Sequence, residues 1–290
     1  MKQEIIKQIK DAVIERLGDG YEVEIHEVLK NNDTKLTGMT IKKVGHNVAP
    51  TIYLDKYVDT TEGELMSAAD DIVETYRQHE GRIPENDVVQ LDKEKILNGA
   101  CIWLVNAERN SEILKTCPHT LLLDLAVTYR LVFDHIGDGM ASCLITNQMM
   151  ECYGITLDEL EAAAGKNADK YQTKTMREIM IEMNPGMAML LPDDPIPMYV
   201  ITNESKLFGA TVLAYKDELK RLADSLNSDL YILPSSVHEI IAVPTNAFDD
   251  LSQLQAMVPE VNNTQVQPDE VLSDQVYRYT RETDVLEVAA

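Results

Sequence analysis

The sequence predicts an α+β protein in which a small N-terminal α-β-β-β-α unit precedes a larger mixed α/β unit with a largely antiparallel sheet. Three observations lead to this fold class. Segments with helical periodicity are interspersed with segments that alternate apolar and polar residues. Several neighbouring strands follow one another through short turns, as in a meander or a hairpin. Of the 290 residues, 44% are hydrophobic, which is enough for a substantial core.

The first 80 residues carry the signals of the small unit. Apolar residues recur at helical spacing near the N-terminus, at Ile5, Ile9, Val13 and Leu17. Alternation predicts a strand at residues 21–25, and further strands are expected at 37–44 and 50–54. Thr61 and Glu64 stand in a capping-box pattern, which predicts the start of a helix that ends near residue 81.

The rest of the chain mixes predicted strands with predicted helices. The strands are expected at residues 101–105, 124–133, 141–145, 198–202, 208–215, 229–233 and 238–243. The helices are expected at residues 147–153, 156–164, 174–182, 216–226 and 248–258. Residues 137–140 include two glycines and predict the turn of a hairpin.

The organisation of the chain changes between residues 82 and 118, where a loop with a proline follows the second helix. We therefore expect an N-terminal α+β unit of residues 1–100 and a C-terminal α+β unit of residues 101–261. Residues 262–290 form a polar, acidic tail. We expect its end to be loosely held, because such segments bury little apolar surface, although residues 271–279 contain enough apolar residues to dock.

The charge balance restricts the class of partner. The chain has 49 acidic and 26 basic residues, for a formal net charge of −23. Binding to the phosphate backbone needs clustered Lys and Arg, and the sequence contains no such run. We expect no direct nucleic acid binding, and a partner that is a protein or a small molecule.

The cysteines and the N-terminus predict a cytoplasmic protein. Cys101, Cys117, Cys143 and Cys152 form no Cys-x-x-Cys pair and no zinc pattern, so free thiols are expected. The N-terminus has no apolar segment of signal-peptide length, and the longest apolar runs are too short to span a bilayer. We therefore expect neither secretion nor a membrane partner.

The common catalytic and cofactor motifs are absent. The sequence lacks a Walker loop, Gly-x-Gly-x-x-Gly, His-Glu-x-x-His, Gly-x-Ser-x-Gly and an EF-hand loop. These absences argue against the usual nucleotide-binding, zinc-protease and esterase solutions. We expect no cofactor.

The densest cluster of reactive groups is residues 235–239, with the sequence Ser-Ser-Val-His-Glu. The loop that follows a strand is a common place for binding and catalytic side chains. On an extended backbone Ser236 and His238 share a face, and a His can act as base to a Ser hydroxyl. Glu239 then points to the other face. The candidate site therefore comprises Ser235, Ser236, His238 and Glu239.

Two interpretations of this segment stay open. A Ser-His-acid triad needs an acid from elsewhere, such as Asp124 or Asp229. Alternatively, the hydroxyls bond backbone groups in a turn, while His238 and Glu239 make buried hydrogen bonds or a salt bridge.

Asn203 completes the set of candidate residues. It ends a predicted strand, and Gly209 follows it closely, where close backbone packing is expected. A functional role for Asn203 requires that this strand end lie beside His238. No metal is expected, because His238 and Glu239 point apart and the other histidines are scattered singly.

Several strings carry a resemblance to a known family. They are Leu-Val-Asn-Ala-Glu-Arg-Asn from Leu104, Asp-Leu-Ala-Val-Thr-Tyr-Arg from Asp124, Ile-Thr-Asn-Glu from Ile201, Phe-Gly-Ala from Phe208, Leu-Pro-Ser-Ser-Val-His-Glu from Leu233 and Val-Leu-Ser-Asp-Gln-Val-Tyr from Val271. Over nearly its whole length the chain resembles a family of uncharacterised bacterial proteins, classed as a domain of unknown function. The most specific string is Pro-Ser-Ser-x-His-Glu, from Pro234 to Glu239. The resemblance implies a bacterial cytoplasmic location and brings no activity, cofactor or catalytic residue.

Two functional hypotheses follow. The first is a soluble, non-enzymatic binding or regulatory protein, favoured by the missing motifs, the acidity and the 13 methionines. The alternative is a hydrolase-type enzyme that uses Ser236 and His238. The enzyme hypothesis requires a pocket that contains His238, with an acid within hydrogen-bond reach.

Overall fold

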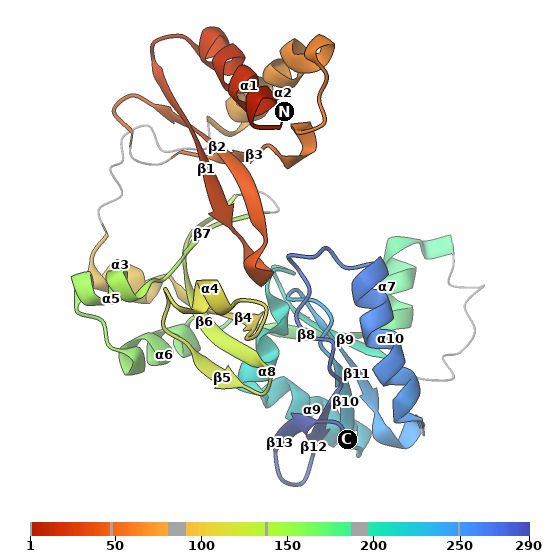
Figure 1. Cartoon of the computed structure of the whole chain (residues 1–290). Helices are drawn as coiled ribbons and strands as arrows, with labels where there is room; N and C mark the ends of the chain where they lie inside the picture. Colours follow the sequence, from red (N-terminus) through yellow and green to blue (C-terminus); the bar gives the residue numbers. More distant parts are fainter. Residues whose placement is uncertain (1, 47–48, 81–90, 137–138, 187–196, 249) are drawn as a thin grey trace. The chain divides into compact units, whose positions relative to one another are not determined.

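The structure, a computed structural model, describes residues 2–46, 49–80, 91–136, 139–186, 197–248 and 250–290. The chain divides into two compact units. Unit 1 contains Met1–Lys30 and Thr34–Asp92, and unit 2 contains Asn31–Asp33 and Lys93–Ala290. Both units combine helices with antiparallel sheets (Figure 1), so the predicted α+β fold class is confirmed.

Unit 1 consists of two helices and a three-stranded antiparallel sheet. Its elements are α1 (Lys2–Leu17), β1 (Tyr21–Leu29), β2 (Lys35–Lys43), β3 (Thr51–Tyr53) and α2 (Leu65–Glu80). The strand order is β1-β2-β3. Both helices contribute to one apolar core with the sheet, which includes Ile9, Val13, Met39, Ile41, Ile72 and Tyr76. The α-β-β-β-α order that the periodicity predicts is confirmed.

The capping box at the start of the second helical segment is also present. The Thr61 amide donates to Glu64 Oε2 at 3.0 Å, and the Thr61 hydroxyl donates to the same oxygen at 2.6 Å. A turn of 3₁₀ helix (Glu62–Glu64) leads from there into α2.

Unit 2 contains a four-stranded antiparallel sheet. Its strands are β4 (Ala100–Asn106), β5 (Thr120–Leu122), β6 (Leu125–Ile136) and β7 (Gly139–Leu144). The order is β4-β6-β5, and β7 also pairs with β6. The strands β6 and β7 form the predicted hairpin pair, although part of its predicted turn, residues 137–138, lies outside the described residues.

A six-stranded antiparallel sheet forms the other half of unit 2. Its strands are β8 (Tyr171–Thr175), β9 (Tyr199–Asn203), β10 (Leu230–Leu233), β11 (Ile240–Pro244), β12 (Tyr277–Thr280) and β13 (Val285–Val288). They lie in the order β13-β12-β10-β11-β9-β8. The prediction of a largely antiparallel sheet in the larger unit is therefore confirmed.

Helices cover both faces of the six-stranded sheet. The helices of unit 2 are α3 (Lys93–Asn98), α4 (Ser111–Leu114), α5 (Asn147–Tyr153), α6 (Leu157–Lys166), α7 (Met176–Met183), α8 (Val212–Tyr215), α9 (Asp217–Leu226) and α10 (Leu251–Thr264). Figure 1 shows α7 and α10 on one face, and α8 and α9 on the other. On the α9 side, the Thr173 hydroxyl donates to Glu218 Oε1 at 2.8 Å.

The prediction of a strand at residues 208–215 is wrong. Phe208 has a φ of 58°, in the left-handed region, which ends any extended backbone there. A 3₁₀ turn (Gly209–Thr211) and the short helix α8 follow. The apolar residues of this segment contribute to the core, because Ala210, Val212 and Leu213 are fully buried.

Strand β8 was missed because its sequence, Tyr-Gln-Thr-Lys-Thr, has no run of aliphatic residues. Pairing with β9 forms it, with Tyr171 opposite Asn203 and Thr175 opposite Tyr199. Thr175 then caps α7, and its amide donates to Glu178 Oε2 at 2.7 Å. The helix predicted at residues 174–182 is thus observed two residues later.

The C-terminal segment docks on unit 2, as the apolar residues at 271–279 allow, and its end is held as well, which differs from the expectation of a loosely held end. Strand β12 pairs with β10, and β13 pairs with β12. Tyr277 and Tyr279 are fully buried at alternate positions of β12. Acidic composition at exposed positions does not prevent docking when alternate residues supply an apolar face.

Candidate functional site

Residues 234–237 are tied to a second segment of unit 2, residues 270–273. The Val237 amide donates to the Glu270 carbonyl at 2.9 Å, and the Leu272 amide donates to the Ser235 carbonyl at 3.0 Å. Ser236 and Val271 form an isolated antiparallel bridge. Two of the strings that carry the family resemblance therefore lie side by side.

Ser236 and His238 do not form the expected hydroxyl–imidazole pair. The backbone bends at Val237 and His238, and Ser236 Oγ accepts a hydrogen bond from the His238 amide at 3.0 Å. Ser236 is buried, with 7% of its surface exposed. Its hydroxyl therefore supports a turn, the role that short polar side chains usually have after a strand.

The imidazole of His238 has other partners. Its Nδ1 lies 3.3 Å from the Phe208 amide, which donates to it, and its Nε2 lies 3.5 Å from Glu270 Oε1. Since Nδ1 accepts, the proton of the neutral ring is on Nε2 and faces the carboxylate. Glu270 is thus the acid beside His238, in place of the expected Asp124 or Asp229.

Aromatic packing fixes the ring further. Phe208 stacks on His238 with ring centroids 5.7 Å apart and an interplanar angle of 29°. Phe208 also packs edge to face against Trp103, with ring centroids 6.1 Å apart. The guanidinium of Arg130 lies 4.7 Å from the Trp103 ring centroid. Both the hydrogen bonds and the stacking favour a structural role for His238.

Asp124 is the centre of a separate buried network. Ser273 Oγ donates to Asp124 Oδ2 at 2.7 Å, and the Tyr277 hydroxyl donates to Oδ1 at 2.5 Å. Asn106 donates to the Leu272 carbonyl at 3.1 Å beside it. Burial and the adjacent carboxylate raise the pKa of Tyr277. This carboxylate therefore connects β6 to the C-terminal segment and does not serve His238.

Asn203 lies beside the His238 segment, as a functional role would require. Its neighbour Thr202 donates to the His238 carbonyl at 2.8 Å. The Asn203 side chain itself is occupied, because Nδ2 donates to Asp169 and to the Leu207 carbonyl, each at 2.7 Å, and Oδ1 accepts from the Leu207 amide at 3.1 Å. These bonds fix the loop after β9.

Glu239 points away from this cluster, as strand alternation predicts, and lines a pocket of about 510 Å³. The register of the sheet forms the pocket floor from two rows of side chains. Ile241, Val200 and Lys174 face one another across β11, β9 and β8. Glu239, Thr202 and Gln172 make the next row, since Ile240 is opposite Ile201 and Thr202 is opposite Gln172.

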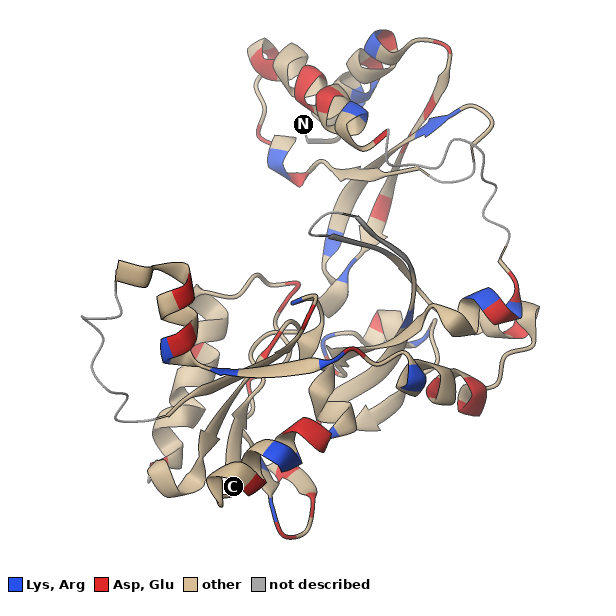
Figure 2. Cartoon of the chain, turned by 180° about the vertical axis from the view of Figure 1, so that it is seen from behind, with Lys and Arg blue, Asp and Glu red and all other residues tan. Residues whose placement is uncertain are grey.

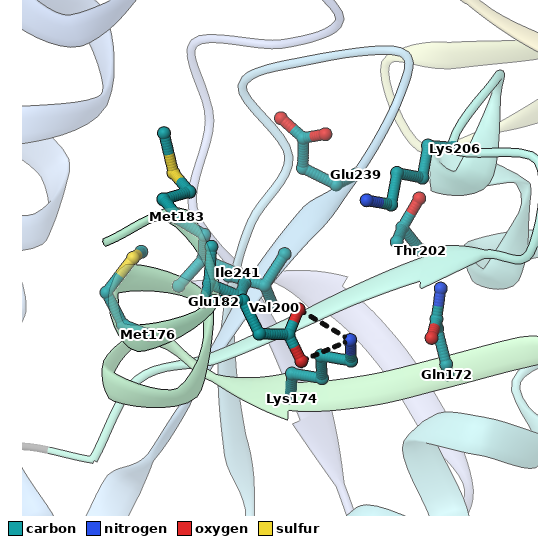
Figure 3. A pocket seen from close by; sticks show the side chains of 11 residues that line it. Gln172, Lys174, Met176, Glu182, Met183, Val200, Thr202, Lys206, Glu239 and Ile241 are labelled. Atoms are coloured by element: carbon teal, nitrogen blue, oxygen red, sulfur yellow. Dashed lines mark hydrogen bonds and ion pairs between the residues drawn. The ribbon is translucent and has the colours of Figure 1, made fainter. Parts of the chain in front are cut away.

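Helix α7 forms the apolar wall of this pocket. It contributes Met176, Ile179 and Met183 to the lining. Figure 3 shows the two methionines on one side, with Lys206, Thr202 and Gln172 on the other.

The charged groups of the pocket differ in their partners. Lys174 Nζ lies 2.7 and 2.8 Å from the two oxygens of Glu182 (Figure 3). Within the described part of the chain, neither Glu239 nor Lys206 forms an ion pair. Burial raises the pKa of the Glu239 carboxyl; nearby His238 opposes this effect and Glu270 adds to it.

A second, smaller cavity of about 230 Å³ lies between the two sheets of unit 2. Cys101, Asp169, Tyr171 and Asn203 are among its lining residues. Burial raises the pKa of the Cys101 thiol to about 11, so it is protonated near neutral pH. A protonated thiol is a weak nucleophile, which argues against cysteine chemistry at this cavity.

Sequence reasoning identified Glu239 and its direction but missed the pocket. It missed β8, which contributes Gln172 and Lys174 to the pocket floor, and it also missed Glu270, the partner of His238. The one available signal was the capping box of Thr175 and Glu178, which marks the start of α7.

The described residues contain no group of three or more His, Cys, Asp or Glu side chains arranged to hold a metal ion. Among the same residues, no helix has the length and apolar character needed to cross a membrane. Figure 2 shows Asp and Glu on helices and connecting segments of both units, with Lys and Arg interspersed.

No curated protein and no solved structure matches the chain. Residues 2–281 match the profile of a family of unknown function, DUF5688, and the chain belongs to that family.

Proposed function

We propose that this chain is a soluble, cytoplasmic, non-enzymatic protein that binds a small ligand in the pocket formed by β8, β9, β11 and α7. The observation that carries the proposal is the pocket itself. Its volume of about 510 Å³ falls within the usual range for small-molecule sites, roughly 300–1,000 Å³. Its lining combines apolar side chains with a few polar ones, which is the usual composition of such sites.

The chemistry around the pocket supports binding over catalysis. Catalysis by a Ser–His pair needs the imidazole to receive the hydroxyl proton. Here Nδ1 of His238 accepts from a backbone amide, and Ser236 Oγ accepts from the His238 amide. Among the described residues that line the pocket, none is a Ser, Cys or His.

The compartment and partners are part of the proposal. Free thiols at all four cysteines and the family resemblance support a bacterial cytoplasmic location. The net charge of −23 supports a partner other than nucleic acid.

The test is to fill the pocket with a larger side chain and to measure whether the protein still retains a bound small molecule. Val200 lies on the floor, so Val200→Trp places an indole in the cavity. The protein is purified from its native host or a related bacterium without harsh washing, denatured, and the released small molecules are compared by mass spectrometry. We expect a compound that is stoichiometric with the wild type and depleted in Val200→Trp.

The matched control is Leu121→Trp, because Leu121 is 70% exposed in the same unit and away from the pocket. It should retain the compound. Thermal melting shows whether each variant is folded. Equal release from folded wild type and folded Val200→Trp would refute the pocket as the binding site.

A further inference from the structure

We propose that the pocket selects ligands that carry an ammonium group on an apolar body, with the Glu239 carboxylate as the counter-ion. This inference rests on the proposed function and names the class of its ligand. It follows from the position of one carboxylate that has no partner in the described part of the chain.

Glu239 is placed in the pocket by the sheet. It precedes β11, lies two residues before Ile241 and therefore shares the pocket face with it. It is only partly exposed. A carboxylate withdrawn from water without a partner is unfavourable, and an incoming cation relieves that cost.

The other carboxylate of the pocket is already neutralised. Both oxygens of Glu182 lie within 2.8 Å of Lys174 Nζ. A ligand cation that approached Glu182 would compete with this lysine, whereas one at Glu239 displaces no cation in the described part of the chain. Among the described residues of the pocket, Glu239 is therefore the carboxylate that a ligand cation can reach without displacing a lysine.

The remaining charges favour a cation over an anion. Lys206 is exposed at the side of the pocket and is solvated, so it has little to gain from a ligand anion. An anion in the pocket would also be repelled by Glu239. The net charge of −23 raises the local concentration of cations and lowers that of anions.

The rest of the lining requires an apolar body. Val200 and Ile241 form the floor, and Met176, Ile179 and Met183 form the wall on α7. Met183 is 83% exposed, and methionine side chains adapt to ligands of different shape. A hydrophobic chain or ring therefore fits beside the ammonium.

Three probes of matched shape test the class: 4-phenylbutylamine, 4-phenylbutan-1-ol and 4-phenylbutanoate. Their dissociation constants are measured near pH 7.5 by isothermal titration or ligand-observed NMR. We expect the amine to bind the wild type at least about tenfold more tightly than the alcohol, as for a hydrogen bond to a charged group. The carboxylate should bind most weakly.

The variant Glu239→Gln keeps the shape of the side chain and removes its charge. We expect it to abolish the advantage of the amine over the alcohol. The control Glu204→Gln removes an exposed carboxylate just beyond β9, outside the pocket lining, and should keep the advantage.

The outcomes separate this inference from the proposed function. If the alcohol binds as tightly as the amine and is lost in Val200→Trp, the pocket binds ligands but the ammonium class is wrong. If the amine keeps its advantage in Glu239→Gln, the inference is equally wrong. If none of the three probes binds the wild type at millimolar concentration, the inference fails, and the proposed function is decided separately by the compounds released from the wild type and from Val200→Trp.

Discussion

At the scale of single residues, the candidate site separates into two halves that face different ways. Ser236 and His238 are bonded to the backbone and to Phe208, so their polar groups stabilise a turn. Glu239, the next residue, faces the pocket and lacks a partner in the described part of the chain. A partly buried carboxylate without a partner reduces stability, and real proteins accept such local costs at functional sites.

The raised pKa of Glu239 has a consequence for stability. A carboxyl whose pKa is higher in the folded than in the unfolded chain binds its proton more tightly when folded. Its ionisation therefore lowers the free energy of unfolding as pH rises from the ordinary Glu value, about 4.3, through the raised value. The deficit is fully present only above the raised pKa of Glu239.

We expect Glu239→Gln to stabilise the protein near neutral pH, by on the order of 0.5 kcal/mol. The gain should become small near pH 4, because the Glu239 carboxyl of the wild type is then largely protonated in both the folded and the unfolded chain. Urea unfolding at pH 4, 6 and 8 measures the change. Glu204→Gln serves as the exposed control and should show no such pH-dependent gain. A loss of stability in Glu239→Gln at pH 8 would show that the carboxylate is already paired.

At the scale of elements, the candidate site is the meeting point of β9, the turn after it and the segment before β11. Gly209 lies at this junction. A Cβ added there would meet the His238 carbonyl and the Thr202 hydroxyl, and would lie 2.8 Å from the Asn203 amide. The close packing that the sequence predicts at this glycine is confirmed. Its neighbours are mostly backbone, which does not move aside cheaply.

Gly209→Ala should therefore destabilise the protein by about 1–3 kcal/mol, the usual cost of overpacking. Gly165→Ala is the matched control, because Gly165 lies in α6 with open space around it. That substitution should stabilise by roughly 0.5–1 kcal/mol through helix propensity. Thermal and urea unfolding measure both. Unchanged stability in Gly209→Ala would mean that the turn is displaced from β9.

At the scale of the whole molecule, the C-terminal segment is part of unit 2. Strand β12 occupies the sheet between β10 and β13. Leu272, Tyr277 and Tyr279 are each fully buried, and burial of one such side chain contributes about 1.5–3 kcal/mol. Their sum is comparable with the total stability of a domain, about 5–15 kcal/mol.

We expect a chain of residues 1–261 to lose the cooperative unfolding of unit 2. The division at residue 100 remains our proposal, and it implies that residues 1–100 unfold cooperatively alone, since unit 1 has its own core. Calorimetry of the two fragments and the full chain tests both statements. In 1–261 only the transition of the 1–100 fragment should remain. Retention of the second transition at its original temperature would show that the tail is dispensable.

The sequence by itself determined most of the element types. Period-two alternation located β1, a run of strand-favouring residues located β6, and an apolar run ended by Pro234 located β10. Capping boxes located the starts of helices, and alternation gave the direction of Glu239. These features depend on neighbours along the chain. Tertiary structure decided what local pattern does not encode. Strand β8 exists because β9 pairs with it, and the tail is ordered because β10 lies beside it.

The same physical reason governs the segment of residues 235–239. Its composition predicted a cluster of reactive groups, but composition does not specify which partner each group meets. Long-range contacts bring Phe208 and Glu270 to the two ring nitrogens of His238. The register of three strands places Glu239 in a pocket with α7. The sequence thus determined which residue types stand in this segment and which faces they occupy. Only the packing of distant segments decided which of their polar side chains remain available to a ligand.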